Sequence, residues 1–157
     1  KIHSERTKLL RKLDNKYNLA IYSKDYRKFK KNGFKNCFPP VSQSNLSEKV
    51  SEIKITLCFN SLATSSFCWS DRVHLMIGSG AFTFVEYVDG ISNFYQDNKD
   101  CIFFRDSNDL LKKISLWMNS KSKNKIRKEG FKTAHRKNSY RAKVEEFLQY
   151  LEDYYES

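Results

Sequence analysis

The sequence predicts a doubly wound α/β fold with a mostly parallel sheet of about five strands and a C-terminal helical tail. Two observations predict it. Short runs rich in aromatic and β-branched residues alternate with amphipathic segments of helical periodicity. Three helix-like segments then follow one another at the end of the chain. Because no internal repeat and no linker-like stretch is present, we expect one domain over residues 1–157.

Each expected strand is short, apolar and bounded by residues that end a ladder. Pro39-Pro40 cannot continue the second strand, and Asp89-Gly90 supplies turn chemistry after the fourth. The strands are expected at residues 19–23, 35–38, 53–59, 81–88 and 101–104.

The expected helices carry apolar residues at helical spacing, and several start at a capping side chain. Ser70 is such a cap, and its helix stops at Gly78-Ser79-Gly80. Asp106 to Asp109 cap another helix, and Gly130 is expected to interrupt the basic helix at residues 121–138. The remaining helices are expected at residues 1–14, 24–31, 44–52 and 140–155, the last burying Val144, Phe147, Leu148 and Leu151.

The composition is that of a folded, basic chain. Hydrophobic residues make up 39% and aromatic residues 15%, which excludes the disordered class. No apolar run is long enough to cross a membrane, and the first six residues lack the apolar core of a signal peptide. The four cysteines form no CxxC pair, so we expect reduced thiols in a cytoplasmic protein and no metal site.

Positive charge is concentrated near the C-terminus. The formal net charge is +11, and residues 121–143 contain ten Lys and Arg against one acid, Glu129. Such a stripe favours anionic partners, namely nucleic acid, an acidic membrane surface or phosphorylated small molecules. A solvated basic helix face is the alternative interpretation.

Candidate binding residues surround the helix that begins at Ser70. A hydroxyl-rich loop containing Ser66 leads to this helix start, where free backbone N–H groups suit a phosphate and Arg72 adds a forked charge. Asn60 ends the preceding strand. Glu86 lies in an otherwise apolar strand, where a carboxylate is costly unless it is near the strand end, paired or facing a ligand.

Known catalytic and nucleotide motifs are missing. The sequence contains no GxSxG, no HExxH, no phosphate loop and no GxGxxG fingerprint. Gly78-Ser79-Gly80 follows a helix rather than opening one, so a helix C-cap is its simplest interpretation. His74 is interpreted as a packing or surface residue rather than a base.

Three stretches carry a resemblance to a known family: RVHLMIGSGAFTFVEYVDGISNFY, CIFFRDSNDLLKKISLWM and IRKEGFKTAHRKNSYRAKVEEFLQYL. They resemble the C-terminal domain of the spore-maturation CgeB-like glycosyltransferases, within the group-1 glycosyltransferases of the GT-B fold. The similar features are Arg72 opening a helix, Gly80 ending it and Glu86 near a strand end. Asp106 with Asp109-Leu110 then opens the next helix, and Asn138-Ser139-Tyr140 follows a basic helix.

The resemblance implies half of a two-domain enzyme: a Rossmann-like domain that binds a nucleotide-activated sugar. An N-terminal domain in a longer chain would supply the acceptor contacts. Arg72 and Ser70 would contact the diphosphate, and Glu86 would lie near the donor pocket. The segment 38–41 would lie near the base. The substrate-binding residues are then Asn60, Ser66, Ser70, Arg72, Gly80 and Glu86.

The family resemblance also implies metal-independent glycosyl transfer, in agreement with the lack of a DxD motif. We expect no cofactor beyond the nucleotide-sugar substrate, and the sequence identifies no catalytic base. Two other functions stay open. One is a module that binds nucleic acid or an acidic surface through residues 121–143. The other is a GT-B-like domain without catalysis, because Leu75 stands where many group-1 relatives have a Glu that binds the ribose hydroxyls.

Overall fold

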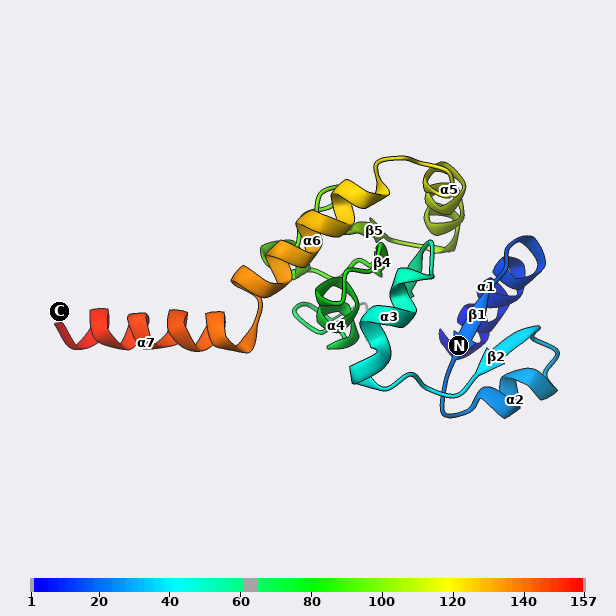
Figure 1. Ribbon diagram of the computed structural model, residues 1–157, viewed down its shortest axis with the longest axis horizontal. Coiled ribbons are helices and arrows are strands. Elements are labelled where there is room, and N and C mark those ends of the chain that lie inside the picture. Colours follow the sequence, from blue (N-terminus) through cyan, green and yellow to red (C-terminus); the bar gives the residue numbers. More distant parts are fainter. Residues whose placement is uncertain (1, 61–64, 157) are drawn as a thin grey trace. The chain divides into compact units, whose positions relative to one another are not determined.

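The computed structural model describes residues 2–60 and 65–156 and forms two compact units, one ending at Asn45 and one beginning at Leu46 (Figure 1). Each unit contains parallel strands alternating with helices, and helices follow the last strand. The predicted α/β class is therefore confirmed. The five strands form a two-stranded and a three-stranded sheet instead of one. The single domain stays a prediction.

The first unit is built around one pair of parallel strands. Its elements are α1 (Ile2–Lys16), β1 (Ala20–Tyr22), α2 (Tyr26–Lys31), β2 (Asn36–Phe38) and the 3-10 turn η1 (Gln43–Asn45). Ala20 of β1 pairs with Asn36 of β2. In α1, Leu9 and Leu13 are buried, as the periodicity predicts.

The second unit contains the three-stranded sheet. Its strands, β3 (Thr56–Cys58), β4 (Thr83–Glu86) and β5 (Ile102–Phe104), lie in that order and are all parallel. The helical elements are α3 (Leu46–Ser51), α4 (Arg72–Gly78), η2 (Ile91–Asn93), α5 (Ser107–Trp117), α6 (Lys123–Lys137) and α7 (Tyr140–Glu156). The strands are shorter than predicted at 53–59 and 81–88, because only their central residues pair with neighbours.

Helices cover both faces of this sheet. Val85 points to a buried cluster with Val73 and Ile77 of α4 and Ala134 of α6. The alternate residue, Phe84, lies on the opposite face with Phe82. Phe82 in turn contacts Trp117 of α5, with ring centroids 5.5 Å apart. This layering follows from the two-residue period of side chains along a strand.

Glycine 130 does not interrupt the basic helix, so that prediction is wrong. The helix α6 runs unbroken from Lys123 to Lys137, and Gly130 is buried in its middle. A Cβ at this position would lie 2.2 Å from the carbonyl oxygen of Asp100 and 2.9 Å from the Ile77 side chain. The glycine therefore permits a close approach between α6 and the loop before β5.

The apolar face of the last helix is exposed, contrary to prediction. Val144, Phe147 and Leu148 of α7 are each more than half exposed, and no residue of α7 is buried among the residues that the structure describes. The apolar periodicity predicts the helix correctly, but its apolar face is not buried by any described element. No helix in the described ranges has the length and apolar character needed to cross a membrane.

Candidate functional site

Polar residues gather where β3 and β4 end. Because these strands are parallel and Cys58 pairs with Val85, the segments after them leave the sheet at the same edge. Asn60 follows β3, and Glu86 is the last residue of β4. In open α/β sheets, ligands bind outside the carboxyl ends of the strands. This edge is therefore the natural position for a ligand site.

Asn60 and Glu86 are joined by two hydrogen bonds. The backbone N–H of Asn60 donates to Glu86 Oε2 at 2.8 Å, and Asn60 Nδ2 donates to the Glu86 carbonyl oxygen at 2.6 Å. Asn60 is only 1% exposed, whereas Glu86 is half-buried. The carboxylate thus lies at a strand end and accepts a backbone hydrogen bond, which are conditions that make a carboxylate tolerable there.

The same asparagine fixes the start of α4. Its Oδ1 accepts from the backbone N–H of Ser70 at 3.0 Å. The hydroxyl of Ser70 accepts from the backbone N–H of Arg72 at 3.3 Å. The N-cap position of α4 is Asp71, one residue later than predicted, and its side chain makes no capping hydrogen bond. A chain of hydrogen bonds therefore links Glu86 through Asn60 and Ser70 to the first residue of α4.

The side chain of Arg72 is oriented by this chain of bonds. Its Nε donates to the Ser70 hydroxyl at 3.0 Å. Arg72 is exposed, and within residues 2–60 and 65–156 its two terminal amino groups have no hydrogen-bond partner. These groups present a charged, forked pair of donors that matches the geometry of a phosphate or carboxylate.

A comparison with known proteins identifies the family. Over residues 6–149, the sequence matches the family described as glycosyl transferase-like. The chain belongs to this family. No curated protein matches the sequence. The match spans most of both compact units and every strand in the described ranges of this glycosyl transferase-like chain.

The structure brings four of the six predicted residues of the glycosyl transferase-like chain into one network: Asn60, Ser70, Arg72 and Glu86. Ser66 lies apart from this network and donates to Asp89 Oδ2 at 3.1 Å, beyond the end of β4. Gly80 precedes β4, so it lies at the other end of the sheet, where the strands begin. There its φ of +79° suits glycine, and its carbonyl accepts from Arg127 Nε at 2.7 Å.

Sequence reasoning missed how His74 is held on α4. Trp69 Nε1 donates to His74 Nε2 at 3.1 Å, and His74 Nδ1 lies 3.0 Å from the Tyr95 hydroxyl. Because an indole N–H only donates, Nε2 must accept, and the imidazole is neutral with its proton on Nδ1. Burial lowers the pKa of His74, although the charge of Asp71 acts in the opposite direction. His74 is thus a packing residue, as the sequence suggested.

Other features of the site bear on its chemistry. Leu75, one residue beyond His74, is 36% exposed on α4. In the described part of the chain, no three His, Cys, Asp or Glu side chains are grouped so that they could hold a metal ion. Arg72 is an exposed cationic side chain at the carboxyl ends of these strands.

Proposed function

We propose that this chain is the nucleotide-sugar-binding half of a GT-B-type glycosyltransferase that resembles the CgeB-like proteins. The substrate is a sugar activated by a nucleoside diphosphate, and the acceptor is bound mainly by another domain of a longer protein. One observation carries the proposal. In a glycosyl transferase-like chain, a hydrogen-bonded network at the carboxyl ends of parallel strands positions the exposed guanidinium of Arg72.

The role of Arg72 follows from the charge that develops during glycosyl transfer. The bond between the anomeric carbon and the diphosphate oxygen breaks, and its electron pair remains on the diphosphate. The acceptor hydroxyl oxygen forms the new bond to the anomeric carbon, and its proton passes to the departing diphosphate or to water. A guanidinium held beside the departing diphosphate stabilises this charge, and a preoriented donor needs little reorganisation. The Ser70 hydroxyl supplies that orientation at 3.0 Å.

Asn60 and Glu86 serve the same site in a different way. The buried Asn60 holds the end of β4 and the start of α4 together, so it acts as a positioning residue. Glu86 is half-buried at the strand end, where a carboxylate suits sugar hydroxyl groups as hydrogen-bond donors. In this proposal, Glu86 therefore meets the sugar and Arg72 meets the diphosphate.

Ligand-induced stabilisation of the full-length protein tests this proposal. UDP, GDP and their common sugar conjugates are added separately, and the melting temperature is measured. We expect at least one to raise it, because a ligand that binds only the folded state stabilises that state. Arg72→Ala should abolish the rise.

The matched control is Arg136→Ala. Arg136 is exposed on α6, and the variant removes the same charge outside the network. It should keep the rise in melting temperature. No shift with any nucleotide, or equal shifts in wild type and Arg72→Ala, would contradict donor binding.

The basic stripe has a structural use that favours the glycosyltransferase proposal over nucleic-acid binding. Arg127 donates to the carbonyls of Gly80 and Val50, and Lys123 donates to the carbonyl of Met118 at 2.6 Å. Lys132 forms an ion pair with Glu129. Part of the charge concentrated in residues 121–143 therefore holds α6 against its surroundings. Binding of nucleic acid stays a prediction, and a salt-dependent affinity for DNA or RNA would support it.

A further inference from the structure

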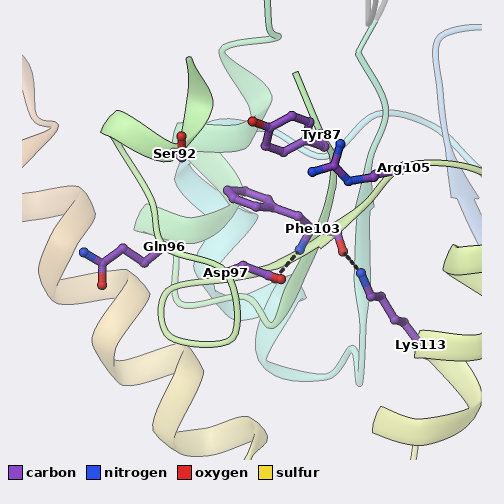
Figure 2. A pocket seen from close by; sticks show the side chains of 7 residues that line it. All are labelled: Tyr87, Ser92, Gln96, Asp97, Phe103, Arg105 and Lys113. Atoms are coloured by element: carbon purple, nitrogen blue, oxygen red, sulfur yellow. Dashed lines mark hydrogen bonds between the residues drawn. The ribbon is translucent and has the colours of Figure 1, made fainter. Parts of the chain in front are cut away.

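A pocket of about 350 Å³ lies at the outer edge of the three-stranded sheet, beside β5 (Figure 2). It is distinct from the network of Asn60, Ser70, Arg72 and Glu86, since none of these residues lines it. Its volume is at the small end of the range for ligand pockets, about 300–1,000 Å³, and suits a single-ring ligand. The residues around it are Tyr87, Ser92, Gln96, Asp97, Phe103, Arg105 and Lys113.

Two aromatic rings form the apolar part of this pocket. Tyr87 follows β4 and Phe103 is the middle residue of β5, and their ring centroids are 5.6 Å apart at an interplanar angle of 68°. Phe103 is 7% exposed and Tyr87 is half-buried, so both rings are held by packing. The more exposed ring, that of Tyr87, offers an apolar surface to the C–H face of a ligand ring.

The backbone of Phe103 at this sheet edge is already satisfied by side chains. Its N–H donates to Asp97 Oδ1 at 2.8 Å, and its carbonyl accepts from Lys113 Nζ at 2.7 Å (Figure 2). Lys113 also forms an ion pair with Asp109 at 3.0 Å. This edge is therefore closed to pairing with another strand, and the charges of Asp97 and Lys113 are engaged in holding the pocket wall.

Arg105 is left as the available charge. Its guanidinium carbon lies 4.4 Å from the centre of the Tyr87 ring, and the residue is exposed. Asp109 is near, but its Oδ2 accepts from the backbone N–H of Arg105 and from Lys113. Within the described ranges, no carboxylate is hydrogen-bonded to the Arg105 guanidinium. A ring-stacked guanidinium still presents its edge to an anion.

The opposite rim supplies neutral polar groups. Ser92 and Gln96 lie across the pocket from Arg105, and both are exposed (Figure 2). The Ser92 hydroxyl can donate and accept, as is needed for hydroxyl groups on a ligand. Gln96 Oε1 already accepts from Lys99 Nζ at 3.0 Å. The pocket therefore combines an aromatic surface, a forked cation and a hydrogen-bonding rim.

We propose that this pocket binds a monosaccharide ring carrying a carboxylate or a phosphate, with the anion on Arg105 and the ring against Tyr87 and Phe103. The pocket is lined by none of the four network residues, so its test does not depend on donor binding. Four probes distinguish the parts of the proposal: glucose 6-phosphate, glucuronate, neutral glucose and inorganic phosphate. Isothermal titration of the full-length protein gives their dissociation constants.

At least one of the two anionic sugars should bind about tenfold or more tightly than both glucose and inorganic phosphate, because a charge-assisted bond and ring contact act together. Which of them binds identifies the anion as carboxylate or phosphate. Arg105→Gln should weaken that binding about tenfold or more, and Arg136→Gln should leave it unchanged. Tyr87→Leu should weaken binding of the anionic sugar but leave binding of inorganic phosphate unchanged.

Several results would overturn the proposal. If neither anionic sugar binds at millimolar concentration, the pocket is not a binding site for such ligands. If glucose binds as tightly as the anionic sugar, Arg105 does not contribute to binding. If inorganic phosphate binds as tightly as the anionic sugar, the aromatic rings do not contribute. Arg72→Ala should leave this affinity intact. A loss in that variant would place the ligand in the donor site instead.

Discussion

Replacing Asn60 by alanine is the most direct test of how the donor edge is built. Within residues 2–60 and 65–156, the side chain donates to the Glu86 carbonyl at 2.6 Å and accepts from the Ser70 N–H at 3.0 Å. Asn60 is 1% exposed and its partners Ser70 and Glu86 are half-buried, so the truncation leaves two partly buried polar groups without this partner. Each buried polar group that loses its partner costs about 1–3 kcal/mol. We therefore expect Asn60→Ala to lower the free energy of unfolding by about 2–6 kcal/mol.

Urea denaturation followed by circular dichroism measures this loss. The control is Asn124→Ala, an exposed position on α6 where the change should stay within about 0.5 kcal/mol. Asn60→Ala should also weaken nucleotide binding in the folded protein, since Ser70 no longer orients Arg72. A loss below about 0.5 kcal/mol would mean that water replaces both bonds. The hydrogen bonds of Asn60 would then not be what holds the start of α4 and Arg72 in place.

Three further changes have outcomes that the structure predicts. Gly130→Ala should lower the free energy of unfolding by about 1–3 kcal/mol or more, because its Cβ meets the Asp100 carbonyl at 2.2 Å. Gly78→Ala is the control, since its Cβ would meet nothing closer than 3.6 Å, and an equal cost would refute the packing argument. The lowered pKa of His74 means that the unfolded state binds the proton more readily. Stability should therefore fall as the pH decreases below the ordinary value of 6.5, and His74→Asn should flatten this part of the unfolding profile. Leu75→Glu, at an exposed position, should leave stability within about 0.5 kcal/mol. It should strengthen binding of the preferred nucleotide about tenfold if the ribose lies at that position, and titration calorimetry that shows no gain would place the ribose elsewhere.

Much of the local structure was predictable because it depends on neighbours in the chain. Asp106 accepts from the backbone N–H groups of Asn108 and Asp109, as its position before an apolar-periodic segment predicts. The strand cores at 83–86 and 102–104 follow from short runs of apolar residues. The parallel neighbours of β4 agree with the order of strands and helices along the chain.

The candidate site was predictable only in part. Arg72 and Ser70 could be proposed because a cap and a following arginine are a local pattern. Gly80 belongs to the same stretch of sequence, yet it lies where the strands begin. Glu86 lies at the carboxyl end of β4, the strand that follows Gly80. The hydrogen bonds of His74 to Trp69 and Tyr95 had no local signal, because Tyr95 is 21 residues away.

The amino-acid sequence by itself determined the class of fold, its short strands and the helix starts, since these depend on periodicity and capping over a few residues. Only the tertiary structure decided that Asn60 would meet Glu86, 26 residues later, because that contact requires the register of β3 against β4. The close contact that leaves no room for a side chain at Gly130 also exists only once α6 packs near Asp100. The β5 pocket arises in the same way, from rings and charges that separate elements bring together.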